Sequence, residues 1–163
     1  LFDVPPEKVE VVIHRQSVIH SMVEFQDGAI LAQLGTPDMR LPIQYALTWP
    51  DRVPSPAEPL DLLACPPLTF HRPDTEAFPA LALAMECART GGTSCAVLNG
   101  ANEAAVGLFL REEIPFGQIP DLVARALDRI PVKYDPCLED ILEADRQARR
   151  VVCEGRSAPE EFK

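Results

Sequence analysis

The sequence predicts an α+β fold, in which a small antiparallel sheet and a short helix precede a C-terminal four-helix bundle. Three observations predict it: β-branched runs around an Asp-Gly pair, a proline-rich middle segment, and four later segments with helical apolar spacing. The chain has 163 residues, of which 47% are hydrophobic and 25% are charged. This balance is typical of globular domains, so we expect a folded chain with a buried core.

Strands are expected within residues 8–35. Residues 9–14 (VEVVIH) are β-branched, with apolar side chains at alternate positions at their start, as in a half-buried strand. Residues 22–25 and 29–34 flank Gln26-Asp27-Gly28. Asp-Gly between two such runs indicates a hairpin, because glycine adopts the positive φ that a tight turn needs. We therefore expect a three-stranded antiparallel meander.

A turn at residues 36–40 and a short helix over residues 41–47 are predicted next, with Pro42 tolerated in the first helical turn. Eight prolines then occur between Pro50 and Pro79. Each fixes φ and lacks an N–H donor, so regular structure is disfavoured there. We expect residues 1–49 to belong to one domain and residues 50–73 to form an extended connector.

The pattern of residues 74–155 predicts the four-helix bundle, and residues 156–163 are expected to form a tail. Asp74 and Pro79 mark the start of the first helix, which is expected to run to about Thr90, where Gly91-Gly92 ends it. Thr93 or Ser94 should cap the second, which reaches about Glu112. The third should span residues 119–129, and the fourth should start at Asp135-Pro136 and end before Gly155. Short links between helices favour antiparallel neighbours in a bundle.

Composition disfavours several classes of function. The net charge of −10 argues against nucleic-acid binding, which needs clustered Lys and Arg. No apolar run approaches the roughly 20 residues of a membrane span, so no membrane association is expected. The five cysteines are scattered without a CxxC pair, which favours reduced thiols in a cytoplasm and gives no zinc-ligand spacing. The chain starts with Leu1 instead of Met, so we expect it to be part of a longer polypeptide.

His14 and His20 enclose a polar segment that contains Ser17 and Ser21. A Ser–His nucleophilic pair is one interpretation, although nothing marks an oxyanion hole. The alternative is a crossover between strands, whose polar side chains satisfy backbone groups.

Three further polar residues share one face of the second long helix: Asn99, Asn102 and Glu103. Asn is unfavourable within a helix, so these residues either bind a ligand or metal or hydrogen-bond neighbouring backbone. We expect the second. Acidic residues at 139, 140, 143 and 145 are expected to form a solvated helix face.

Several long runs resemble the family of 1-deoxy-D-xylulose 5-phosphate reductoisomerase. They are VEVVIHRQSVIHSMVEFQDGAILAQLGTPDMRLPIQYAL, PLDL, LTF, PDTEAFPALALAME and AVLNGANEAAVGLFL, and they are collinear over about residues 1–153. Two positions depart from the family's pattern, which has Pro where Arg15 stands and Ala where Gly100 stands.

The resemblance implies an oxidoreductase of isoprenoid-precursor synthesis that forms 2-C-methyl-D-erythritol 4-phosphate, with NADPH and Mg²⁺ or Mn²⁺. It covers the second half of the family's catalytic domain and its C-terminal helical domain. The nucleotide fingerprint, the metal ligands and the phosphate-binding residues lie in the family's N-terminal region. We therefore expect no catalytic, cofactor-binding or metal-binding residue in this chain, and no activity without that region.

The resemblance also implies a pocket wall. His20 matches the second His of the family's H-x-Q-S-V-I-H-S-M run, which lies near the active site. Pro37, Asp38 and Met39 match a G-x-P-D-M-R loop beside the substrate. A homodimer contact through the sheet is implied as well. The alternatives left open are a non-catalytic module that dimerises through its sheet and an independent Ser–His hydrolase.

Overall fold

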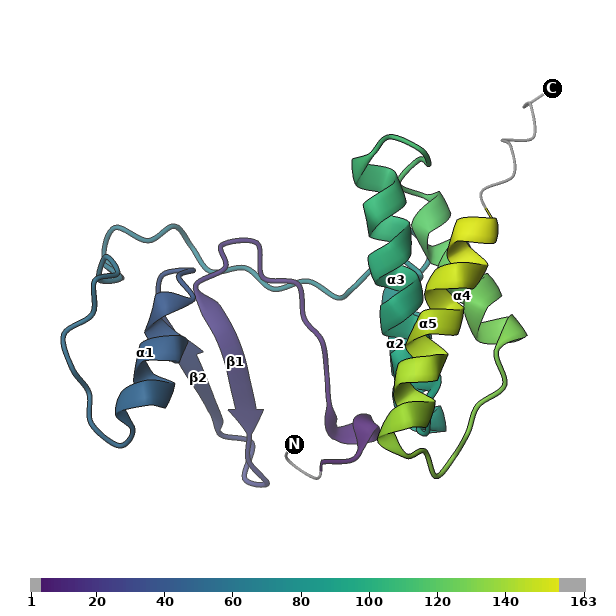
Figure 1. Ribbon diagram of the computed structural model, residues 1–163. Helices are drawn as coiled ribbons and strands as arrows, with labels where there is room; N and C mark the ends of the chain where they lie inside the picture. Colours follow the sequence, from purple (N-terminus) through teal and green to yellow (C-terminus); the bar gives the residue numbers. More distant parts are fainter. Residues whose placement is uncertain (1–3, 156–163) are drawn as a thin grey trace. The chain divides into compact units, whose positions relative to one another are not determined.

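The computed structural model describes residues 4–155 and has the α+β class that the sequence predicts (Figure 1). The described chain divides into two compact units. One contains Val11–Pro73, and the other contains residues 4–10 and 74–155. The tail expected at residues 156–163 lies outside the described residues.

The first unit contains a two-stranded antiparallel sheet, formed by β1 (Ile19–Glu24) and β2 (Ile30–Leu34). The predicted hairpin turn is confirmed, since Gly28 has a φ of 82° and the Asp27 carboxylate accepts the Ala29 N–H at 2.9 Å. Glycine is favoured there because this φ lies in the left-handed region.

The strand expected over residues 9–14 is wrong, and so is the three-stranded meander. Within this segment only Ile13 pairs, in an isolated bridge whose two hydrogen bonds to His71 are 2.9 and 3.0 Å long. A β-branched sequence adopts a ladder only where a second strand offers its backbone groups in register. Among the described residues, His71 alone offers them here.

After β2 the chain forms α1 (Arg40–Thr48), which matches the predicted short helix to within one residue at each end. The following prolines act as expected, because residues 50–73 contain turns and bends but no helix and no strand.

The second unit contains a 3-10 turn, η1 (Pro6–Lys8), and four helices. These are α2 (Ala80–Thr90), α3 (Ser94–Leu110), α4 (Gln118–Arg129) and α5 (Leu138–Glu154). In Figure 1, α3 lies beside α5, and α3 also contacts α2 and α4. The helix η1 contacts α2.

One of the two residues expected at the start of α2 is confirmed, since Pro79 is the N-cap of this helix. Asp74 does not belong to it, because its carboxylate accepts the N–H groups of Glu76 and Ala77 in a separate turn, at 3.1 and 2.9 Å. The predicted start of α5 is wrong. Asp135 does not cap α5. The cap is Cys137, whose own N–H is bound at 3.0 Å by the carboxylate of Asp140, three residues later. This reciprocal capping box decides where α5 starts.

The predicted boundary between the first two long helices is confirmed. Gly91 and Gly92 have φ values of 70° and 57° after α2, and α3 begins at Ser94. Thr93 and Ser94 do not cap through their hydroxyl groups, however. The Thr93 hydroxyl accepts the Lys133 N–H at 3.0 Å, and the Ser94 hydroxyl donates to the carbonyl of Cys87 at 2.9 Å.

The core of the second unit lies between α3, α4 and α5. Alanines are prominent in it: Ala101, Ala105, Ala126 and Ala148 are fully buried. Small side chains let helix backbones approach, and larger residues fill the remaining space. The larger core residues include Val97, Leu108, Leu122, Val123 and Val152.

Candidate functional site

His20 lies in β1 at a break in the strand register. Ile19 pairs with Leu34 but Ser21 pairs with Gln33, so His20 is the extra residue of a β-bulge. Bulges redirect a side chain relative to the regular alternation of a strand. The His20 ring nitrogen Nε2 lies 3.2 Å from the carbonyl oxygen of Gly35. A carbonyl only accepts hydrogen bonds, so Nε2 carries the proton and donates.

Gly35 begins the loop that the sequence analysis singled out. Its N–H donates to the carbonyl of Val18 at 3.0 Å, which holds the loop against the end of β1. The next residue, Thr36, donates its hydroxyl to the carbonyl of Glu58 in the connector at 2.9 Å. The loop is therefore held by β1 on one side and by the connector on the other.

Asp38 and Arg40 form an ion pair across Met39. Asp38 accepts the main-chain N–H of Arg40 at 2.9 Å and its guanidinium Nε at 2.9 and 3.0 Å, and Nη2 donates to the same carboxylate. These side-chain hydrogen bonds from Arg40 lower the pKa of the Asp38 carboxyl and raise the pKa of Arg40.

The structure thus joins His20 to the loop that carries Pro37, Asp38 and Met39. The link runs through the carbonyl of Gly35. Pro37 and Met39 are exposed, and Asp38 is half-buried beneath its ion pair. Sequence reasoning missed Arg40, Gly35 and Thr36 as the groups that hold this loop. The Asp-x-Arg spacing was the available signal for Arg40.

A second polar cluster ties residues 14–16 to the end of the connector. His14 donates through Nδ1 to the carbonyl of Thr69 at 2.9 Å, and its ring stacks on Phe70 at 4.9 Å between centroids. The Gln16 amide donates to the carbonyl of Pro67 and exchanges hydrogen bonds with Thr69. These contacts confirm the interpretation that polar side chains of this segment satisfy backbone groups.

The Ser–His nucleophilic pair does not form. Within residues 4–155, no serine hydroxyl hydrogen-bonds a histidine ring, and His14 and His20 instead bind the carbonyls of Thr69 and Gly35. General-base activation requires hydrogen-bond contact between the two side chains. The geometry therefore gives no support to a hydrolase.

The expected backbone contacts of the polar residues on α3 are also absent. Asn99 and Glu103 are exposed and Asn102 is half-buried. In the part of the chain that the structure describes, none of the three side chains makes a hydrogen bond. The interpretation that these side chains hydrogen-bond neighbouring backbone is therefore wrong for the described residues.

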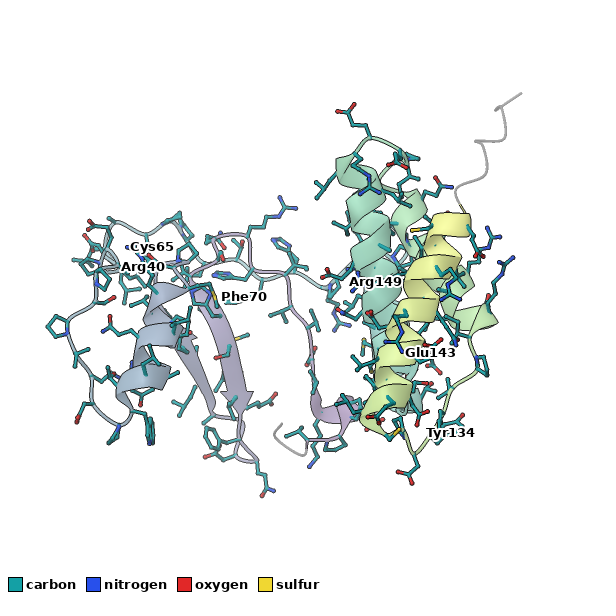
Figure 2. The ribbon with its side chains drawn as sticks, viewed as in Figure 1. Arg40, Cys65, Phe70, Tyr134, Glu143 and Arg149 are labelled. Carbon is teal, nitrogen blue, oxygen red and sulfur yellow. The ribbon has the colours of Figure 1, made fainter. Side chains whose placement is uncertain are left out.

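The acidic face of α5 consists largely of ion pairs. Glu143 binds Arg146 and Asp145 binds Arg149, at 2.9 and 2.8 Å, and Asp140 binds Lys133. Figure 2 labels Glu143 and Arg149 on this helix. The four acids remain accessible to solvent, as expected, and three of them pair with cations.

Residues 4–155 contain no group of three or more His, Cys, Asp or Glu side chains that could hold a metal ion. Over the same residues, no helix is both long and apolar enough to cross a bilayer.

Comparison with known proteins covers nearly the whole chain. The family model for the DXP reductoisomerase C-terminal domain matches residues 34–151. The 1-deoxy-D-xylulose 5-phosphate reductoisomerase of Acetivibrio thermocellus is 55% identical over 152 residues, which are 93% of this chain and 40% of that protein. The enzyme of Aromatoleum aromaticum is 54% identical over 151 residues. The chain therefore spans about 40% of the length of the curated relatives it matches.

Solved structures agree. The reductoisomerase from Zymomonas mobilis in complex with NADPH has a TM-score of 0.89 and 46% identity, covering 97% of this chain and 42% of that one. A reductoisomerase in complex with NADPH, fosmidomycin and magnesium also has a TM-score of 0.89, with 42% identity, covering 96% of this chain and 40% of that one. The chain therefore belongs to the DXP reductoisomerase C-terminal domain family.

Proposed function

We propose that this chain supplies the C-terminal part of an NADPH-dependent enzyme that converts 1-deoxy-D-xylulose 5-phosphate to 2-C-methyl-D-erythritol 4-phosphate. One observation carries the proposal: sequence similarity of 55% identity continues over 93% of the chain and stays within one region of the relative. A chain that corresponds to one contiguous part of the enzyme would show such an uninterrupted match.

The proposed division of labour separates three segments, of which the first two lie mainly in the Val11–Pro73 unit. Residues 1–49 complete the catalytic domain, residues 50–73 connect, and residues 74–155 form a four-helix bundle. The boundary near residue 73 is supported by the separation of the compact units. The bundle is supported by the contacts of α3 with α2, α4 and α5.

Within this function, His20, Pro37, Asp38 and Met39 line the pocket. Supporting this role, the loop is fastened at Gly35 and Thr36 while Met39 projects with 71% of its surface exposed. A rigid backbone that presents a free side chain suits a pocket wall, because the geometry is set before the ligand arrives.

The chemistry belongs to the region that the relatives contain beyond the match. The donors present here do not fit a divalent cation, since the described residues contain no cluster of ligands. Nor does the sequence contain a GxGxxG fingerprint for a dinucleotide. We therefore assign no step of hydride transfer or of metal-assisted rearrangement to this chain's own residues.

The test is a joined polypeptide, in which this chain replaces the matching 40% of the Acetivibrio thermocellus enzyme. We expect oxidation of NADPH that depends on the ketose phosphate and on Mg²⁺. The isolated chain and the relative without its C-terminal part are the two controls, and both should be inactive. A folded but inactive joined polypeptide would contradict the proposal, and so would activity of the isolated chain.

A second candidate is a non-catalytic module that dimerises through its sheet. The exposed edge expected at residues 9–14 no longer motivates it, because that segment forms no strand. The β1–β2 hairpin supports this candidate instead. Its residues Ile30 and Leu31 are 58% and 65% exposed and point to opposite faces of the sheet. Sedimentation of the isolated chain tests it: a strict monomer at high concentration counts against this module and against a homodimer contact through β1 and β2.

We infer a cytoplasmic location from the five free cysteines at 65, 87, 95, 137 and 153. Unpaired thiols are typical of a reducing compartment.

A further inference from the structure

The residues on either side of Met39 bind one another through their side chains. Within residues 4–155, every hydrogen bond of the Asp38 side chain goes to Arg40, which offers its main-chain N–H and two guanidinium nitrogens to one carboxylate. Figure 2 labels Arg40 at the first turn of α1. The three-residue segment is therefore closed into a ring with Met39 at its centre.

The backbone of Met39 is fixed as well. The Leu41 N–H donates to the carbonyl of Asp38 at 3.1 Å, and the Ile43 N–H donates to the carbonyl of Met39 at 3.2 Å. On the other side, the Asp38 N–H donates to the carbonyl of Thr36 at 2.8 Å. Met39 is held at the start of α1 while its thioether extends into solvent.

A carboxylate is poorly suited to line a pocket for a phosphorylated ketose. Its charge would repel the phosphate, and repulsion between like charges strengthens as water is excluded. In this structure the guanidinium of Arg40 neutralises that charge and occupies both carboxylate oxygens. The same side-chain hydrogen bonds lower the pKa of Asp38, which favours its charged, paired form.

We propose that Asp38 is a positioning residue, whose ion pair with Arg40 holds Met39 against the substrate, and that Asp38 itself does not contact the substrate. This inference rests on the proposed function and refines it. Asp38 no longer counts among the four residues that line the pocket, and it positions Met39 instead.

The first experiment observes Met39 directly in this chain. The sequence has three methionines, Met22, Met39 and Met85, so ¹³C-methyl labelling yields three signals. Asp38→Asn and Arg40→Gln each remove the ion pair. In both variants we expect the Met39 methyl signal to shift and its order parameter to fall, while Met85 in α2 stays unchanged.

The matched control is Glu143→Gln, which breaks the comparable exposed ion pair with Arg146 on α5. It should leave Met39 unmoved. If either test variant fails to fold, the other still removes the pair. An unchanged Met39 signal in the folded variants would overturn the inference, whatever the activity of the complete enzyme.

The second experiment uses the joined polypeptide described above. If Asp38 acts through Met39, then Asp38→Asn and Met39→Ala should each lower kcat/KM by about tenfold, and the double variant should lower it no further. Additive losses would overturn the inference, since they would mean that Asp38 acts on its own. An inactive parent polypeptide would count against the proposed function instead, and the methyl spectrum would still decide the role of Asp38.

Discussion

Gly100 of α3 faces the backbone of Asp145 in α5. A β-carbon placed on Gly100 would lie 2.9 Å from the carbonyl oxygen of Asp145 and 2.6 Å from its Oδ1. Glycine is poorly suited to the middle of a helix. The close approach of α3 and α5 favours glycine at this position, because a β-carbon would meet the backbone of Asp145.

We predict that Gly100→Ala destabilises the helical unit. The change should gain about 1 kcal/mol of helix propensity, but the contact with Asp145 backbone costs about 1–3 kcal/mol. Thermal unfolding followed by circular dichroism should show a lower Tm. The matched control is Gly107→Ala in the same helix, where the nearest atom is Arg111 Nη1 at 3.5 Å, and its Tm should rise. A higher Tm for Gly100→Ala would contradict the prediction, since it would mean that α3 and α5 move apart enough to accept the methyl group.

Leu108 should be the costliest single truncation on α3. Its side chain is 1% exposed and packs in the core shared with α4 and α5. Leu108→Ala should reduce the free energy of unfolding by about 2–5 kcal/mol, because it loses buried area and leaves a cavity. Urea denaturation measures this. Leu110→Ala, two residues later and 73% exposed, should change stability by no more than about 0.5 kcal/mol.

Asp140 should make the start of α5 sensitive to acid. Hydrogen bonds from Lys133, and then from Cys137, lower the pKa of this carboxyl from 3.8 to about 2. A lowered folded-state pKa stabilises the fold above pH 3.8, and this stabilisation is lost as the pH falls through about 2. Wild type and Asp140→Asn should therefore differ in Tm at pH 5 and converge near pH 2.

An NMR titration of the Asp140 carboxyl carbon checks the cause. Lys133→Met should raise the midpoint toward the ordinary value of an aspartate, because the largest favourable contact is gone. An unchanged midpoint would assign the shift to Cys137 and the helix end alone.

Gln16 should hold the end of the connector in place. Its amide makes hydrogen bonds to the carbonyl of Pro67 and to both the N–H and the hydroxyl of Thr69. Gln16→Ala should speed amide hydrogen exchange at Thr69 by roughly tenfold or more, since lost hydrogen bonds contribute about 1 kcal/mol each. Gln33→Ala is the control, because its amide reaches only the neighbouring carbonyl of Leu34. Equal exchange at Thr69 in both variants would refute this role.

The boundary of α5 shows where sequence patterns mislead. Asp135-Pro136 has the residue types of a helix start, and Cys137 ranks low as a cap by type. Asp140 decides between them, because its carboxylate binds the Cys137 N–H and also pairs with Lys133. Lys133 in turn donates its N–H to Thr93, forty residues away. The Cys137–Asp140 box is local, but no short pattern contains the contact between Lys133 and Thr93.

The sequence by itself determined what depends on neighbouring residues. The Asp27-Gly28 turn, the end of α2 at Gly91-Gly92, the irregular proline segment and the family all follow from short runs of residues. Local φ preferences and missing donors act within a few positions, so they can be seen in the chain order. Tertiary structure alone decided that residues 9–14 form no strand, that Gly100 meets Asp145, and how Gly35 and Thr36 hold the Met39 loop. Each of these needs a partner that is distant in sequence, and only the folded chain brings the two together.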